Sequence, residues 1–297
     1  MVETSIIIPT YHRKKSLLRL LDSFNNQLTD KEEIIIVEQG ENNGIEFRKR
    51  ANALRFHLIY LFEKQIGTSR AKNIGAKQAR GSYFVFFDDD VIVKKDCIAC
   101  LIRNLSDKSI GIVGGRVLTP GQKIEEKRDD VGRISLLTQF SDGFSSNIKQ
   151  EVDTIIGCNM AIRRDVFSTV NGFDSHFIGA FREESDLCLR VKKSGFRVLF
   201  EPEAIVIHMR EPKGGARKTE GRLDWYVMFF SNETYFFLKY RPIVLLPIFL
   251  LTRFSYILRC MFGFGREVSI RSILTPWKGI WDGIDKFIKY KVHKVIK

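Results

Sequence analysis

The chain carries three consecutive aspartates, Asp88, Asp89 and Asp90, directly after an apolar run at residues 83–87. Three adjacent carboxylates repel one another, so a folded strand end that holds them is stabilised when a cation lies among them. A few oxygen ligands with open coordination positions suit Mg²⁺ or Mn²⁺ bound together with a substrate phosphate. Aspartate also favours solvated turns. On the residues alone, both interpretations stay open.

A second acidic group, Glu183, Glu184 and Asp186, opens a predicted helix that ends at Gly195. A carboxylate can take a proton from a hydroxyl that lies within hydrogen-bond reach. Acidic residues also stabilise the N-terminus of any helix through the helix dipole. The group is therefore either a source of a general base or an ordinary helix start.

Other polar groups are less specific. His208 ends a predicted strand, and a loop rich in glycine, lysine and arginine follows at residues 210–222. The loop could fold over a diphosphate with its backbone amides and cations, or it could be an exposed linker. Cys97 and Cys100 have no second cysteine pair and no nearby histidine, so we expect core residues rather than zinc ligands.

Hydrophobic periodicity predicts the elements that position these groups. Apolar runs alternate with helical patterns, which predicts an α/β fold with a mostly parallel sheet buried on both faces. The predicted strands are residues 5–8, 34–37, 58–62, 83–87, 112–117, 134–140, 198–200 and 204–207. Ligands bind outside the carboxyl ends of such strands. Those ends carry Pro9, Thr10, Tyr11, Glu38 and the three aspartates.

The order of these motifs resembles that of the family 2 inverting glycosyltransferases, which have the GT-A fold. The segments that carry the resemblance lie between residues 5 and 208 and read SIIIPTYHR, IIIVEQG, GTSRAKNIGAKQARGSYFVFFDDD, GCNMAIRRDVF, NGFDSHF, EESDLCLR and EPEAIVIH. The resemblance implies a nucleotide-sugar donor, a divalent metal (Mg²⁺ or Mn²⁺) on a D-x-D motif, and one carboxylate base. A metal on the two phosphates stabilises the charge that develops as the nucleoside diphosphate leaves.

The resemblance also implies which residues hold the nucleotide. Arg70 and Asn73 are similar to residues of the helix that closes over it. Glu38 stands where the family usually has aspartate. The expected pocket for the base and ribose comprises Pro9, Thr10, Tyr11 and Glu38.

The resemblance further assigns the metal ligands. Asp88 and Asp90 match the outer positions of the D-x-D motif, with Asp90 the preferred ligand. Asp89 is expected near the ribose or the sugar. His208 stands at a position that in this fold can face the metal or the diphosphate, although a structural role is an equal expectation.

The same resemblance assigns the base. Glu183 and Glu184 match the family's Glu-Asp pair, whose second member deprotonates the acceptor hydroxyl. Glu184 is therefore the expected base, one methylene longer than the usual aspartate, and Asp186 is its rival.

Composition and charge point to the partners. The chain has 297 residues, 44% hydrophobic and 28% charged, which excludes collagen-like and largely disordered proteins. Its net charge is +13, and residues 210–297 alone contain 17 Lys/Arg against 7 Asp/Glu. Many phenylalanines lie in that same segment, which favours an anionic membrane surface as partner over nucleic acid. Five scattered cysteines and no recognisable signal peptide predict a reducing cytoplasm.

We therefore expect a GT-A catalytic domain at residues 1–222 and a helical membrane-associating region at residues 223–297. The strongest apolar run, residues 243–251, is interrupted by Pro247 and is shorter than the roughly 20 residues of a spanning helix. It is expected to lie in the membrane interface, with Arg253 and Arg259 toward the headgroups, or to form a re-entrant hairpin. The expected location is the cytoplasmic face of the cell membrane.

The predicted function is metal-dependent, inverting transfer of a sugar, with a UDP-sugar as default donor, to a hydroxyl of a cell-surface or lipid-linked glycan. A nucleotidyltransferase that forms sugar nucleotides is one alternative, but such enzymes usually carry a glycine-rich loop where this chain reads PTYHR. A basic nucleic-acid-binding module is the other, but it would carry a recognised motif and basic residues in the folded part. Metal-dependent release of nucleoside diphosphate from a sugar nucleotide distinguishes the first function from both.

Overall fold

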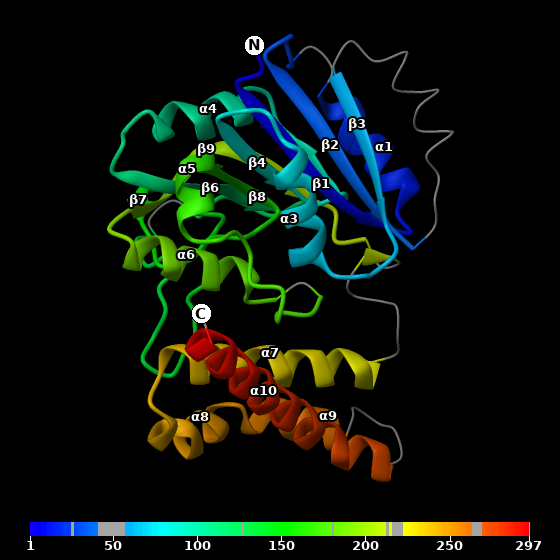
Figure 1. Cartoon of the computed structure of the whole chain (residues 1–297), viewed down its shortest axis with the longest axis vertical. Coiled ribbons are helices and arrows are strands. Elements are labelled where there is room, and N and C mark those ends of the chain that lie inside the picture. Colours follow the sequence, from blue (N-terminus) through cyan, green and yellow to red (C-terminus); the bar gives the residue numbers. More distant parts are fainter. Residues whose placement is uncertain are drawn as a thin grey trace.

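The computed structural model of the chain describes residues 1–24, 27–40, 57–125, 128–179, 181–211, 214–215, 222–262 and 269–296. A nine-stranded sheet forms the upper part of the molecule in Figure 1. Its strands lie in the order β3-β2-β1-β4-β8-β6-β9-β5, and β7 pairs with β9. Their bounds are β1 Thr4–Tyr11, β2 Glu32–Gln39, β3 His57–Glu63, β4 Tyr83–Phe87, β5 Val91–Val93, β6 Ile110–Leu118, β7 Gln150–Glu151, β8 Asn159–Arg163 and β9 Arg197–His208.

The sheet is parallel in its first half and mixed in its second. Strands β1 to β4 pair in parallel, as the alternation of strands and helices predicted. Strand β8 runs antiparallel between β4 and β6, whereas β6 and β9 are parallel to each other. The carboxyl ends of β1, β2 and β4 therefore share one edge, where the predicted nucleotide and metal residues lie.

Helices cover both faces of the sheet (Figure 1). Helices α1 (Lys14–Ser23) and α4 (Cys97–Leu105) pack on one face, and α3 (Thr68–Gln78), α5 (Arg164–Thr169) and α6 (Glu183–Lys193) pack on the other. Strand β1 shows the pattern: Ile6 and Ile8 contribute to the first core and Ile7 to the second, because successive strand residues point to opposite faces. An α/β fold with a buried central sheet is thus confirmed.

Two strand predictions differ from the structure. Residues 134–140 form no strand; Ile134 and Phe140 are joined only by an isolated bridge, because Ser135 and Gln139 close a turn between them. The two runs predicted at 198–200 and 204–207 belong to the single strand β9, whose register with β6 shifts after Glu201. Cys97 and Cys100 are buried in the core as predicted, and burial raises the pKa of the Cys97 thiol.

Four helices and a short 3₁₀ turn form the lower layer in Figure 1, which we call the helical unit. They are α7 (Arg222–Tyr240), the turn at Ile243–Leu245, α8 (Leu246–Thr252), α9 (Phe254–Phe262) and α10 (Ile270–Ile296). Glycines let α10 approach α7 closely: an added Cβ on Gly283 would lie 2.5 Å from the carbonyl oxygen of Ser231. Within the described ranges, no helix combines the length and the apolar character needed to cross a bilayer.

One expectation about the helical unit is wrong. Arg253 does not face outward toward headgroups; it is 4% exposed and pairs with Glu233 of α7. A buried carboxylate attracts a guanidinium because an unpaired charge in the interior is costly. The side chain of Arg259 lies outside the described part of the chain.

Candidate active site

The predicted metal ligands come from two strand ends that the sheet places together. Asp88 and Asp90 follow β4, and β5, which starts directly after Asp90, pairs antiparallel with the end of β9, so that Val91 lies opposite His208. One ligand atom from each of Asp88, Asp90 and His208 lies within 4.8 Å of the others. This register unites residues that are far apart in the sequence.

The surroundings of Asp90 suit a metal ligand. Its Oδ2 accepts a hydrogen bond from the Glu211 backbone amide at 3.1 Å and lies 3.0 Å from a guanidinium nitrogen of Arg13. Its Oδ1 is buried and lies 3.1 Å from Nε2 of His208, and no other described residue binds this oxygen. Burial alone would raise the pKa of Asp90, but His208 and Arg13 lower it to about 2. An ionised oxygen beside a second carboxylate and an imidazole fits a divalent cation.

Asp89 is oriented differently from its two neighbours. Thr10 donates a hydrogen bond of 2.7 Å to Oδ2, and Arg13 donates one of 3.1 Å to Oδ1. Burial raises the pKa of Asp89 to about 7, although Arg13 and Thr10 oppose the rise. Its two oxygens therefore tie β1 and the residue that precedes α1 to the end of β4. The expected contact with ribose or sugar stays a prediction.

The predicted nucleotide residues line the ends of β1 and β2. The parallel register sets Pro9 beside Val37, Thr10 beside Glu38 and Tyr11 beside Gln39. Tyr60 of β3 donates a hydrogen bond of 2.5 Å to Glu38. Gly40 follows β2 with a φ of +88° and approaches the ring of Tyr11 so closely that an added Cβ would lie 2.5 Å from it. The backbone of Gly40 and the ring of Tyr11 therefore pack together at the carboxyl ends of β1 and β2.

The acidic pair at the start of α6 lies beside a buried lysine. Lys72 of α3 is 1% exposed, and its Nζ lies 3.5 Å from Oε1 of Glu183. Oε2 of Glu184 is shielded from solvent and makes no hydrogen bond to the described residues. Burial and the neighbouring Glu183 raise the pKa of Glu184 well above its usual range, and Lys72 opposes the rise. Gly157 lies close to both, since an added Cβ would lie 3.1 Å from Lys72 Nζ and 3.5 Å from Glu184 Cβ.

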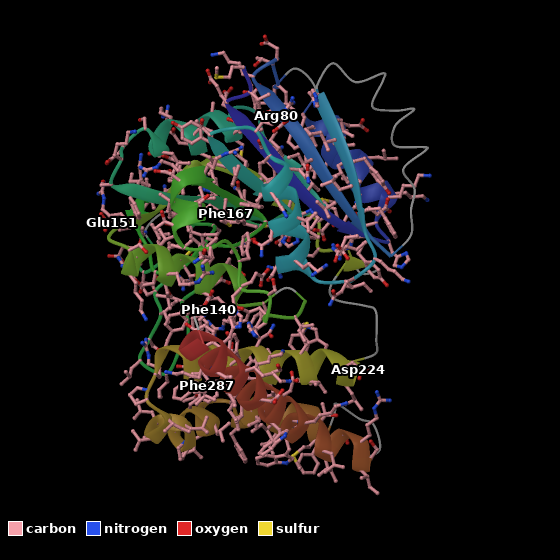
Figure 2. The ribbon with its side chains drawn as sticks, in the orientation of Figure 1. Arg80, Phe140, Glu151, Phe167, Asp224 and Phe287 are labelled. Carbon is pink, nitrogen blue, oxygen red and sulfur yellow. The ribbon has the colours of Figure 1, made fainter. Side chains whose placement is uncertain are left out.

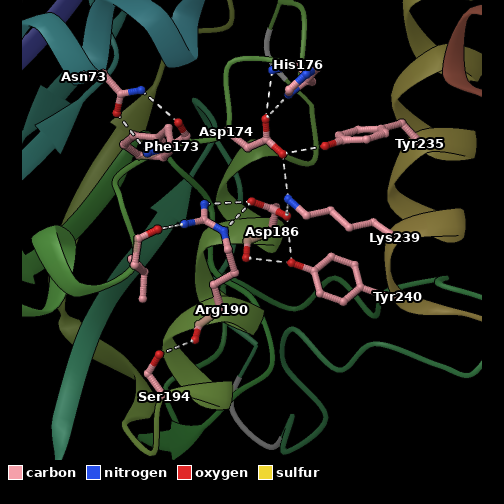
Figure 3. Close-up of polar contacts among 11 residues, drawn as sticks. Asn73, Phe173, Asp174, His176, Asp186, Arg190, Ser194, Tyr235, Lys239 and Tyr240 are labelled. Carbon is pink, nitrogen blue, oxygen red and sulfur yellow. Dashed lines mark hydrogen bonds and ion pairs between the residues drawn. The ribbon is translucent and has the colours of Figure 1, made fainter. Parts of the chain in front are cut away.

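Three predicted residues are engaged by partners other than the metal ligands. Asp186 is fully buried on another face of α6, where Lys239 Nζ lies 2.6 Å away and Tyr240 donates a hydrogen bond of 2.7 Å (Figure 3). Asn73 exchanges two hydrogen bonds of 2.8 Å with the backbone of Phe173. Arg70 is exposed and lies 3.4 Å from Glu63. The engagement of Asp186 favours Glu184 as the base.

The sequence reasoning missed Arg13 and Lys72. Arg13 contacts two of the three aspartates and also donates to the carbonyl oxygen of Glu211 at 3.1 Å. Lys72 has a signal that was available: it shares the face of α3 that carries Gly75 and Ala76, the face that packs on the sheet. Most of the predicted loop at residues 210–222 lies outside the described residues.

Comparison with protein families identifies the chain. A model of glycosyl transferase family 2 matches residues 5–170, and one described as the N-terminal domain of galactosyltransferase matches residues 138–212. Glycosyltransferase AglE of Haloferax volcanii is 24% identical over 226 residues, 74% of this chain and 71% of that protein. Probable glycosyltransferase YdaM of Bacillus subtilis is 24% identical over 257 residues, 82% of this chain and 60% of that protein.

Solved structures share the fold. GalNAc-T7 with UDP, GalNAc and Mn²⁺ superposes with a TM-score of 0.63 at 15% identity, over 80% of this chain but only 50% of that one. A mannosyltransferase from Pyrobaculum calidifontis in complex with GDP-Man and Mn²⁺ gives 0.57 at 17% identity, over 98% and 75%. TarS 1–349 of S. aureus with UDP-GlcNAc gives 0.59 at 13% identity, over 98% and 92%. The fold is GT-A, and the chain belongs to glycosyl transferase family 2.

Proposed function

We propose that this glycosyltransferase moves a sugar, with inversion, from a nucleoside-diphosphate sugar to a hydroxyl of a cell-surface or lipid-linked glycan. The observation that carries the proposal is the pairing of two sites. Asp88, Asp90 and His208 form a metal-binding group at the sheet edge, and Glu184 lies with a shielded, unpartnered carboxylate oxygen at the start of α6. Buried Lys72 lies near both, with its Nζ 3.5 Å from Glu183; burial opposes its charge, but Glu183, Asp88 and Glu184 raise its pKa.

Asp88, Asp90 and His208 would hold Mn²⁺ or Mg²⁺, which when bound neutralises charge on the donor's diphosphate. Two carboxylates and one imidazole favour Mn²⁺, because Mg²⁺ prefers oxygen ligands. Thr10, Tyr11 and Glu38 would face the base and ribose. UDP is the proposed nucleotide, since two of the three similar solved structures hold UDP or UDP-GlcNAc and one holds GDP-Man.

Glu184 would take the proton of the acceptor hydroxyl. Burial raises the pKa of Glu184. The ionised form of Glu184 is therefore a stronger base than an exposed glutamate. Lys72 keeps a positive charge beside the acidic pair, which offsets the cost of ionising Glu184. Inversion requires the acceptor to attack from the side opposite the leaving diphosphate, so the base and the metal group must flank the sugar.

The helical unit would bring the enzyme to the cytoplasmic face of an anionic membrane. Large apolar side chains are exposed along the 3₁₀ turn, α8, α9 and α10: Ile243, Val244, Ile248, Leu251, Phe254, Phe262, Ile270, Leu274, Trp277, Trp281, Ile288 and Val292. We call these residues the apolar surface. Exposed lysines and arginines of α10 accompany it, namely Arg271, Lys278, Lys289 and Lys291. Apolar area with basic residues around it is typical of helices that lie in a membrane interface.

A donor screen tests the proposed transfer. Sugar nucleotides of UDP, GDP and dTDP are added to the full chain with Mn²⁺, with Mg²⁺ or with a chelator. We expect one nucleotide class to raise Tm and to release nucleoside diphosphate, and only when metal is present. Nucleoside diphosphate release that continues in chelator, or no stabilisation by any donor, contradicts the proposal.

A further inference from the structure

Two buried clusters of charge join α7 to the first turn of α6, the turn that carries Glu183 and Glu184. In the first cluster Glu233 of α7 lies between two guanidinium groups. Nε of Arg182 is 2.5 Å from one of its oxygens, and Nε of Arg253 is 2.8 Å from the other. None of the three side chains is more than 5% exposed.

Arg182 is the residue that directly precedes α6, and its backbone has a φ of +75°. A left-handed conformation at a residue with a side chain is strained, so it persists only where the surroundings hold it. The guanidinium of Arg182 also donates to the carbonyl oxygen of Thr138 at 2.7 Å and lies 4.7 Å from the ring centre of Phe140. Figure 2 shows Phe140 between the sheet and the helical unit.

The second cluster lies on the other side of Glu184 in the sequence. Lys239 Nζ lies 2.6 Å from Asp186 and 2.6 Å from Asp174, and Tyr240 donates to Asp186 at 2.7 Å (Figure 3). Tyr235 donates to Asp174 at 2.6 Å. Asp174 follows Phe173, whose backbone is bound by Asn73, the neighbour of Lys72 on α3.

Arg182 and Asp186 thus bracket Glu184, and both are held by α7. Removal of one member of a buried ionic cluster leaves its partners charged and unpaired, so the local structure must shift. In contrast, the donor-side residues Thr10 and Asp90 bind Asp89, Arg13, His208 and Glu211, and none of these described partners lies on α7. We propose that α7 positions the catalytic base: Glu233, Lys239 and Tyr240 are positioning residues that fix the first turn of α6. This inference rests on the proposed function in naming Glu184 as the base.

The test compares Lys239→Met with Lys286→Met. Lys286 is a matched control, because it is also a buried lysine of the helical unit. Its partners are Asp282 at 3.0 Å and Ser231 at 2.6 Å, both within that unit. We expect Lys239→Met to lower kcat for transfer about 10- to 100-fold while donor KM and donor Kd in Mn²⁺ change little. Lys286→Met should keep kcat, and Lys239→Arg, which retains the charge, should restore most of it.

Hydrogen exchange supplies a readout besides activity. Amides of residues 183–187 should exchange faster in Lys239→Met than in the wild type. In Lys286→Met their exchange rates should equal those of the wild type. Tyr240→Phe, a smaller change, should show the same pattern more weakly and serves if Lys239→Met does not fold. Equal losses of kcat in the two methionine variants, or a loss of donor affinity in Lys239→Met, overturn the inference. A wild-type enzyme that uses no donor overturns the proposed function instead, and exchange still tests the positioning.

Discussion

At the residue scale, the three aspartates are distinguished by their partners. Arg13 lies between Asp89 and Asp90, and Thr10 binds Asp89. These contacts leave Oδ1 of Asp90 and the half-buried Asp88 facing the imidazole of His208. The two carboxylates repel each other in the absence of metal. A cation placed between them offsets this repulsion and stabilises their charged forms.

Asp90→Asn should abolish Mn²⁺-dependent donor binding, because the amide removes the charge but keeps the shape. We expect kcat to fall by about 100-fold or more, since the metal supplies several kcal/mol of charge stabilisation. Calorimetric titration of donor with and without Mn²⁺ measures the effect. Asp130→Asn, an exposed aspartate of a loop, is the control. Wild-type donor affinity and turnover in Asp90→Asn would remove Asp90 from the metal site.

Glu184→Gln should retain donor and metal binding but lose transfer by about 100- to 10,000-fold, because an amide cannot accept the acceptor's proton. Asp186→Asn should act differently. Its partners Lys239 and Arg190 lose the charge of Asp186, and Lys239 keeps only Asp174, so we expect a loss of about 3–5 kcal/mol in the free energy of unfolding. Transfer assays beside urea unfolding separate the two. A stable, inactive Asp186→Asn with an active Glu184→Gln would reverse the assignment.

The raised pKa of Glu184 predicts a pH dependence of stability. The folded chain holds this proton above pH 4.5, the ordinary value, while the unfolded chain releases it, because burial and Glu183 disfavour the charge. Stability therefore falls as pH rises from 4.5 toward the raised pKa. Glutamine does not titrate, so Glu184→Gln loses no stability for this reason as pH rises. The difference between its free energy of unfolding and that of the wild type should therefore increase with pH over that range. Urea unfolding at several pH values checks this, and a difference that is constant with pH contradicts it.

At the scale of elements, the sequence predicts where the polar ends of the strands lie, but it does not predict the partners of Asn73 and Asp186 on their helices. Apolar runs ending in Thr10, Glu38 and Asp88 identify parallel strands and place their polar ends on one edge. The direction of a helical side chain depends on which elements pack around it. Asn73 binds Phe173 and Asp186 binds Lys239, and neither partner is close in sequence. Periodicity alone therefore could not predict these contacts.

The contact between α3 and the turn at Phe173 gives an element-scale prediction. Asn73→Ala leaves the amide and the carbonyl of Phe173 without partners, which costs about 1–3 kcal/mol of stability. Arg70→Ala changes an exposed residue of the same helix and should alter stability by no more than about 0.5 kcal/mol. Urea unfolding of both variants checks the difference. If instead Asn73→Ala is stable but binds donor weakly, Asn73 contacts the nucleotide.

At the scale of the whole molecule, the helical unit is more than an appendage. Removal of residues 241–297 would take away Arg253, the partner of Glu233, and would uncover the face of α7 on which α10 packs. A truncated chain is therefore a poor test of membrane binding, because it also disturbs the elements beside Glu184. Substitutions on the apolar surface avoid this problem, since these side chains are at least half exposed.

Trp277→Ser with Trp281→Ser should weaken binding to vesicles without slowing hydrolysis of the donor. The two indoles are 52% and 72% exposed, and tryptophan is favoured at the boundary between headgroups and acyl chains. Cosedimentation with vesicles should increase with the content of anionic lipid, because each basic residue near the surface contributes about 1 kcal/mol to the binding free energy. Salt should reduce this binding only partly. Leu136→Ser removes an exposed apolar residue elsewhere and is the control. If the wild type stays unbound beside anionic vesicles, the apolar surface contacts another protein or a second copy of the chain, and the membrane proposal fails.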